Sequence, residues 1–152
     1  MTEHVRSIDV GAVWDPNDPD AVLLARESRA VLALRARWDD ADDRAVVLSW
    51  VDARLASIGP PNDEAINGHP LYEKGLRDVL WVGTVHDSEL VAELERRNRV
   101  HPGHRRAGWK GLHHFVVRTK EKLIEVVAEA VSVERVPGST VEAAVACLPS
   151  GD

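Results

Sequence analysis

The chain has 152 residues, 44% of them apolar and 29% charged, which fits one soluble globular domain and excludes a wholly disordered chain. Its net charge of −6 argues against general nucleic-acid binding, and no apolar run is long enough to span a bilayer. A single cysteine, Cys147, excludes an internal disulfide and a multi-cysteine zinc site. Because residues 1–14 lack the basic and apolar regions of a secretory signal, we expect a cytoplasmic protein with no membrane partner.

Alternation of apolar and polar residues predicts antiparallel strands in the first half of the chain. Residues 4–14 alternate loosely, and further strands are predicted over 21–26, 30–38 and 44–57. Alanine, leucine and arginine also favour helices, so a single helix over residues 20–38 is the alternative. The clearest alternation is in the third strand, where one face carries Ala30, Leu32, Leu34, Ala36 and Trp38.

The middle of the chain is predicted to change from irregular backbone to a strand and then to a helix. Residues 58–77 contain three prolines and three glycines, which predicts irregular backbone over most of this stretch. A strand is predicted over 78–86, followed by the main helix over 88–99, with Asp87 or Ser88 as its N-cap. Two pairs at helical spacing support this helix, Glu93 with Arg97 and Glu95 with Arg99.

The last third of the chain is predicted to be mainly strand. Residues 112–120 form one predicted strand and residues 123–136 another, because the second run is rich in β-branched residues. Residues 121–135 also fit a helix, and that alternative remains open at the level of the sequence. A capping-box pattern predicts a short helix over 140–147.

Together these elements predict a single α+β domain over residues 1–148 and a loose C-terminal tail at 149–152. The predicted architecture is a curved antiparallel meander sheet of about six or seven strands, packed against one main helix at 88–99.

Charge is strongly segregated along the chain. From Arg96 to Lys120 there are eight lysine and arginine residues and four of the seven histidines, without a carboxylate. The remaining chain has 11 basic against 25 acidic residues. Such segregation is typical of an anion site, and equally of a segment that folds against acidic surface of its own chain. Two of the histidines, His113 and His114, are adjacent on a predicted strand and are expected to face opposite ways.

The leading hypothesis from this pattern is a noncatalytic binding or interaction protein. Its anion-preferring surface would lie over residues 97–110, bordered by the loop at 60–72. The loop from Gly103 to Gly111 combines glycines with cations, so backbone amides and side chains could both contact an anion. The expected partner is a small anionic ligand or an acidic protein surface. The candidate ligand-binding residues are Arg99, His101, His104, Arg105, Arg106, Trp109 and Lys110.

The rival hypothesis is a small enzyme, with or without a metal, that uses histidines and carboxylates as acid, base or ligands. Its residues would be Asp63, Glu64, His69, His101 and His104, with Glu64, His69 and His101 as the candidate catalytic residues. The chain contains no HExxH and no GxSxG motif, and we expect no metal and no cofactor. A third interpretation is architectural, with the two loops held to backbone by Asn62, Asp63, His69 and Asn98.

Several segments of the second half resemble a recurrent pattern in small bacterial proteins of uncharacterised function. The resemblance covers roughly residues 59–128. It implies no activity, substrate or catalytic residue, and its one structural implication is that the two irregular stretches belong to one unit. The segments that carry it are Pro61–Ala65 (PNDEA), Gly68–Tyr72 (GHPLY), Asn98–His104 (NRVHPxH) and His113–Val116 (HHFV).

Overall fold

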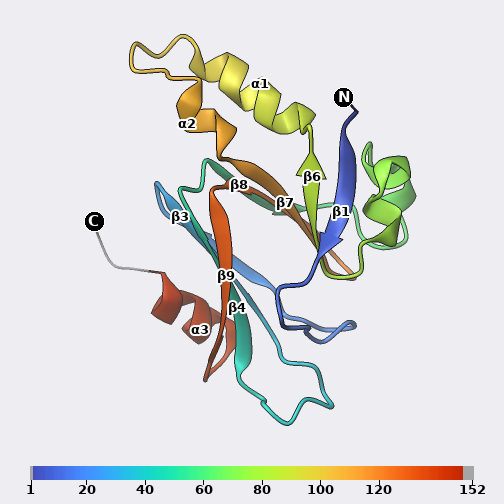
Figure 1. Cartoon of the computed structure of the whole chain (residues 1–152). Helices are drawn as coiled ribbons and strands as arrows, with labels where there is room; N and C mark the ends of the chain where they lie inside the picture. Colours follow the sequence, from blue (N-terminus) through green and yellow to red (C-terminus); the bar gives the residue numbers. More distant parts are fainter. Residues whose placement is uncertain (1, 149–152) are drawn as a thin grey trace.

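The computed structural model describes residues 2–148, in which nine strands form two antiparallel sheets that pack face to face (Figure 1). The first sheet has the strand order β1-β6-β7-β8-β5 and the second has the order β2-β3-β4-β9. The strands are β1 (His4–Ile8), β2 (Val22–Ala25), β3 (Arg29–Leu34), β4 (Ala45–Val51), β5 (Leu55–Gly59), β6 (Val82–His86), β7 (His113–Arg118), β8 (Leu123–Ala128) and β9 (Ala130–Val136). The helices are α1 (Glu89–Asn98), α2 (Ala107–Lys110) and α3 (Thr140–Cys147), and single 3-10 turns occur at η1 (Ile66–Gly68), η2 (Tyr72–Lys74) and η3 (Leu76–Asp78).

The main core lies between the two sheets, and its side chains follow the alternation seen in the sequence. Leu32 of β3 and Leu48 of β4 are cross-strand partners whose side chains point inward from the second sheet. Ile124 of β8 and Phe115 of β7 point inward from the first sheet and belong to the same buried cluster. Burial of each such side chain contributes about 1.5–3 kcal/mol, so this shared layer holds the sheets together.

The expected single curved meander of six or seven strands is wrong, because two predicted strands divide between the sheets. The run over 44–57 leaves β4 and enters β5 at Asp52, which has a positive φ of 50°. The run over 123–136 leaves β8 and enters β9 at Glu129. The two runs pair with each other as one ribbon, β4 with β9 and β5 with β8, and this ribbon folds over at the bends. Both of its halves therefore bury apolar side chains in one core. The two bends are joined by amide-to-carbonyl hydrogen bonds from Glu129 to Val51 and from Arg54 to Val127.

The outer faces of the two sheets have different covers. Helix α3 packs Ala143 against Val47 on the outer face of the second sheet. The 3-10 turns place Leu76 over the outer face of the first sheet, where it meets Val116. The backbone of this second cover comes close to β1 at Gly75, whose φ is 120° and where an added Cβ would lie 2.3 Å from the carbonyl oxygen of Val5.

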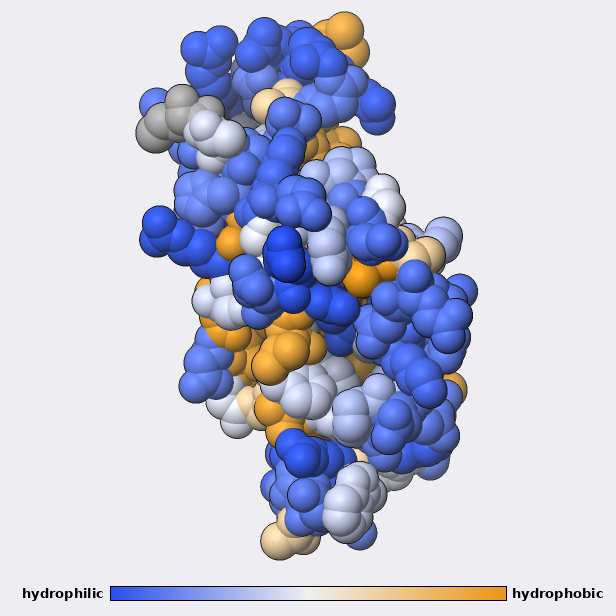
Figure 2. All heavy atoms as spheres, turned by 90° about the vertical axis from the view of Figure 1, so that its right-hand side faces the viewer, coloured by the Kyte–Doolittle hydropathy of each residue, from blue (hydrophilic) through white to orange (hydrophobic). Residues whose placement is uncertain are grey.

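Hydrophilic residues predominate on the side that faces the viewer in Figure 2, and hydrophobic ones show mainly in its middle.

The predicted helices are present, and strands occupy both stretches for which a helix was the alternative. Ser88 is the N-cap of α1, and its hydroxyl accepts a hydrogen bond from the amide of Val91. The capping box at Ser139 and Glu142 begins α3, so the expectation of one main helix was incomplete. No helix within residues 2–148 combines the length and apolar character that crossing a membrane requires. The predicted loose tail at 149–152 lies outside the described residues.

Candidate functional site

Much of the basic stretch folds against carboxylates that precede it on α1. The carboxylate of Glu93 pairs with both Arg96 and Arg97, as expected from their spacing along the helix. One carboxylate shared by two guanidinium groups leaves a net charge of +1 among these three side chains. The charge segregation of the sequence is in this part reduced within a single helix.

Glu95 is the second and more central partner of the basic stretch. One carboxylate oxygen accepts from the guanidinium of Arg99 at 2.8 Å, and the other lies 3.1 Å from Nε2 of His104. The nearest guanidinium nitrogen of Arg106 is 3.9 Å away. The hydrogen bond from Arg99 lowers the pKa of Glu95 below its ordinary value, and His104 adds to this against the opposing effect of burial.

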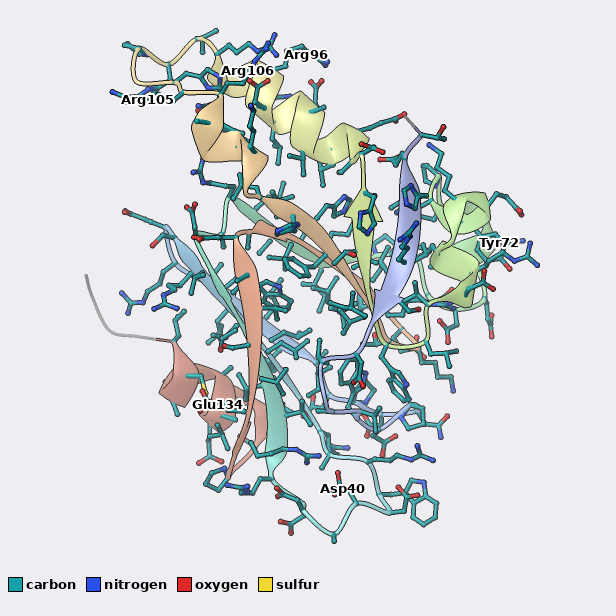
Figure 3. The ribbon with its side chains drawn as sticks, in the orientation of Figure 1. Asp40, Tyr72, Arg96, Arg105, Arg106 and Glu134 are labelled. Atoms are coloured by element: carbon teal, nitrogen blue, oxygen red, sulfur yellow. The ribbon has the colours of Figure 1, made fainter. Side chains whose placement is uncertain are left out.

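The remaining predicted ligand residues lie on the loop after α1 and on α2. Arg105 and Arg106 are exposed at the end of the molecule formed by α1 and α2 (Figure 3). His101 is exposed, and its Nδ1 accepts from the amide of Gly103. Within residues 2–148, neither Arg105 nor Lys110 has a carboxylate in ion-pair range.

A cleft of about 630 Å³ lies between α1, α2 and the ends of β6 and β7. Three of the seven predicted ligand residues, Arg106, Trp109 and Lys110, contribute to its lining. Its apolar surface includes Val91 and Leu112, and the guanidinium of Arg54 stacks over the Trp109 ring at 4.9 Å. The volume is in the range of small-molecule sites. The other predicted residues, Arg99, His101, His104 and Arg105, do not line this cleft.

A chain of three polar groups begins at the wall of the cleft, where Ser88 and His114 contribute to the lining and Glu125 does not. Ser88 Oγ lies 2.8 Å from Nδ1 of His114, and Nε2 of that ring lies 3.0 Å from Oε1 of Glu125. The His114 side chain is only 3% exposed. The hydrogen bond between His114 and Glu125 lowers the pKa of Glu125, although burial of the Glu125 carboxyl raises it. The sequence predicted Ser88 as a candidate helix cap and predicted that His113 and His114 face opposite ways. It did not predict the contact between Ser88 and His114.

The polar groups continue from the cap of α1 toward β1. Both oxygens of Glu3 are engaged, one with the Lys74 ammonium at 2.8 Å and the other with the Glu89 amide at 2.6 Å. Sequence reasoning missed Glu3 because its partners lie more than 70 positions away along the chain. Cys147 lies apart from these groups, and burial raises the pKa of its thiol to about 11.

The residues of the rival enzyme hypothesis are not brought together. Asp63 pairs with the guanidinium of Arg118, and Nδ1 of His69 accepts from the amide of Leu71. Glu64 is exposed, and within residues 2–148 His104 is the one candidate histidine with a carboxylate in ion-pair range, that of Glu95. Among residues 2–148, no group of three or more His, Cys, Asp and Glu side chains is arranged to hold a metal ion.

The expected border between the 60–72 loop and residues 97–110 is also not formed. No hydrogen bond or ion pair joins these two stretches in the part of the chain that the structure describes. Figure 3 shows Tyr72 at one side of the molecule, away from Arg105 and Arg106. The reason is that the loop covers the outer face of the first sheet, whereas residues 97–110 extend from the end of α1.

Both irregular stretches are nevertheless held by local polar contacts. Oδ1 of Asn62 accepts from the Ala65 amide, and the Asn98 amide group lies 2.9 Å from Nδ1 of His104. Arg118 donates to the carbonyl oxygens of Leu76 and Val79 in addition to its bond with Asp63. Asn62 and His69 thus bond to backbone amides, as the architectural interpretation expects, whereas Asp63 and Asn98 contact other side chains.

Comparison of the chain with protein-family models, with curated proteins and with solved structures gives no match.

Proposed function

We propose that the protein binds a small anionic molecule with an apolar body in the cleft between α1 and α2. The observation that carries this proposal is that Arg106 and Lys110 share the lining of the cleft with the apolar side chains of Val91, Trp109 and Leu112. A cation beside a desolvating surface attracts an anion more strongly than the same cation in open water. The proposed anion site is therefore smaller than the surface predicted over residues 97–110, and its cations lie at α2.

The charge balance of the cleft supports an anionic ligand. Glu95 contributes to the lining, but its carboxylate is already hydrogen-bonded to Arg99 and His104. Asp87 is the other carboxylate among the lining residues, and Arg106 and Lys110 are the two lining residues with permanent positive charge. One monovalent group such as a carboxylate or sulfonate fits this balance better than a polyanion. Three arginines that could serve a polyanion, Arg96, Arg97 and Arg99, are paired with Glu93 and Glu95.

The apolar lining supports the second half of the proposal. Val91 and Leu112 offer aliphatic surface, and Trp109 offers a partly exposed ring on which a flat or branched apolar group can pack. An acidic protein surface is the other partner that the charge pattern suggests. A hollow with an apolar lining favours a small molecule over a flat protein contact.

Binding of the fluorescent probe 8-anilinonaphthalene-1-sulfonate tests this proposal, because the probe has an aromatic body and one sulfonate. We expect saturable binding that weakens about tenfold in an Arg106→Ala, Lys110→Ala double variant, through loss of charge-assisted contacts. Titrations followed by fluorescence, with native folding checked by circular dichroism, measure the effect.

Two controls make the test specific. Arg105→Ala removes a cation from the same loop but outside the cleft and should leave probe affinity unchanged. The neutral analogue N-phenyl-1-naphthylamine has the same kind of aromatic body without the sulfonate, so its binding should be insensitive to the double variant. Equal sulfonate affinity in wild type and the double variant would show that the proposed site is wrong.

A further inference from the structure

Two hydrogen bonds join the side chains of Ser88, His114 and Glu125 in a continuous chain, which begins at the wall of the cleft. All three groups are satisfied together when Nε2 of His114 carries the proton and donates to Glu125, because Nδ1 then accepts from the Ser88 hydroxyl. A hydroxyl, an imidazole and a carboxylate in this order can activate a serine as a nucleophile. The carboxylate fixes the tautomer, and either ring nitrogen can serve as the base.

Burial and access are both suitable for this role. Ser88 is 9% exposed, and both it and His114 contribute to the lining of the cleft. The imidazole is therefore shielded from water, while the serine borders the space that a ligand would occupy. Ser88 also begins the ten-residue helix α1, so negative charge that develops on a carbonyl oxygen bound there would lie near the positive end of the helix dipole.

The first turn of α1 still offers a backbone donor. The Glu89 amide is taken by Glu3 and the Val91 amide by Ser88 Oγ. Among residues 2–148, no acceptor is in hydrogen-bond range of the Leu90 amide. This amide is the candidate donor to the carbonyl oxygen of a bound ester.

We infer that Ser88 is the nucleophile of an ester hydrolase, with His114 as its general base and Glu125 as a positioning residue, acting on amphipathic anionic esters bound in the cleft. This inference rests on the proposed binding function, because Arg106 and Lys110 would hold the anionic end of the substrate. Its substrate class is an ester whose apolar part contacts Trp109 and Leu112.

The reaction balances with water as the only co-reactant. Ser88 Oγ forms a bond to the ester carbonyl carbon, and its proton moves to Nδ1 of His114. The carbon–oxygen bond to the leaving alcohol breaks, and the alcohol takes that proton from the imidazole. Water then attacks the acyl-serine, gives a proton to the same nitrogen, and releases the acid and free Ser88, which recovers the proton. Glu125 holds the imidazolium that exists between the two proton transfers.

Hydrolysis of two 4-nitrophenyl esters tests the activity: the neutral butyrate and the hydrogen glutarate, which carries one carboxylate. We expect the wild-type protein to hydrolyse the anionic ester faster, and Lys110→Ala to remove that preference. Ser88→Asp keeps an N-cap acceptor and removes the nucleophile, so it should lower the rate at least about 100-fold. The matched control is Ser139→Ala, which removes the other helix-capping serine at a place outside the cleft and should keep the activity.

A covalent probe makes the test independent of any variant. An alkyl fluorophosphonate should add once to the wild-type protein, with loss of fluoride, and peptide mass spectrometry should find the adduct on Ser88. Unchanged hydrolysis in folded Ser88→Asp would overturn the inference. So would a wild-type protein that neither hydrolyses the esters nor takes the label. If that inactive protein still bound the anilinonaphthalene sulfonate through Arg106 and Lys110, the binding function would stand and only the catalytic role would be lost.

Discussion

At the scale of single residues, Glu95 controls how much positive charge the cleft presents. Its carboxylate is largely buried, and Arg99, His104 and Arg106 all approach it. One acidic side chain thus engages two of the seven residues that the sequence suggested for ligand binding, Arg99 and His104, and lies near a third, Arg106, without a hydrogen bond. Glu93 does the same for Arg96 and Arg97 on the outer side of α1, away from the cleft.

Replacing Glu95 should therefore change ligand affinity in a predictable direction. Glu95→Gln removes the negative charge from the cleft and frees the neighbouring cations, so the affinity for 8-anilinonaphthalene-1-sulfonate should rise about threefold or more. Glu93→Gln is the matched control, because it frees two arginines outside the cleft and should change affinity little. Fluorescence titration at low and high salt measures both variants. A fall in affinity for Glu95→Gln, in a protein that remains folded, would contradict the charge argument.

At the scale of elements, Glu3 ties three separate parts of the chain together. It stands just before β1, and it binds the ammonium of Lys74 on η2 and the first amide of α1. Burial raises the pKa of Glu3 and is the largest single influence on it. The hydrogen bonds from Lys74 and the Glu89 amide outweigh burial, and the net pKa is below the ordinary value of 4.5. The charged form is thus favoured by the fold, and it holds the start of α1, where Ser88 lies.

The lowered pKa of Glu3 predicts an acid-dependent stability. A carboxyl whose pKa is lower in the folded than in the unfolded state stabilises the fold above its unfolded pKa, and this contribution is lost as the pH falls through the folded pKa. The free energy of unfolding should therefore fall below pH 4.5, as the carboxyls of Glu3 and Glu125 are protonated. Glu3→Gln should lose about 1–2 kcal/mol at pH 7 and depend less steeply on acid.

Urea unfolding curves at pH 7 and at pH 3.5 measure this difference. The exposed carboxylate of Glu64 supplies the control, because Glu64→Gln should match the wild type at both pH values. An equal loss of stability on acidification in wild type and Glu3→Gln would mean that Glu3 does not contribute to the acid sensitivity.

At the scale of the whole molecule, the two sheets share one core and should unfold together. The folded-over ribbon of β4–β5 and β8–β9 belongs to both sheets, and the layer between them contains the largest cluster of buried side chains among residues 2–148. The covers on the outer faces are separate, with α3 on one sheet and the 3-10 turns on the other. Loss of packing in the shared layer should therefore destabilise both sheets, whereas loss of packing under one outer cover should destabilise only the sheet that it covers.

Truncation of Ile124 tests this coupling. Ile124→Ala removes a fully buried side chain from the shared layer and should cost about 2–5 kcal/mol. Hydrogen exchange should increase in strands of both sheets by a similar free energy, because both open in the same transition. Leu80→Ala is the control, since Leu80 is 73% exposed and its truncation should have little effect. Increased exchange confined to the first sheet would show that the sheets unfold independently.

Much of the secondary structure could be predicted because local rules decide it. Alternation along β3 and β4 grouped on one face the residues that turn out to point inward, such as Leu32 and Leu48. The predicted caps, Ser139 and either Asp87 or Ser88, marked where helices begin. The ion pairs within α1 followed from residue spacing alone. Each of these features depends on residues a few positions apart, so a short window of sequence contains the necessary information.

Tertiary structure alone decided the division into two sheets and the composition of the site. The bends at Asp52 and Glu129 occur within strand-like sequence, and they form because each half of the ribbon gains a core to pack against. In the same way, Ser88, His114 and Glu125 meet only because β7 pairs with β8 and the start of α1 lies beside β7. Glu3 reaches α1 only through the pairing of β1 with β6. The sequence by itself determined an α+β chain with a basic segment near residue 100. Spacing along α1 determined which arginines pair with Glu93 and Glu95, and only the tertiary packing of α1, α2 and the first sheet determined which cations border a cleft.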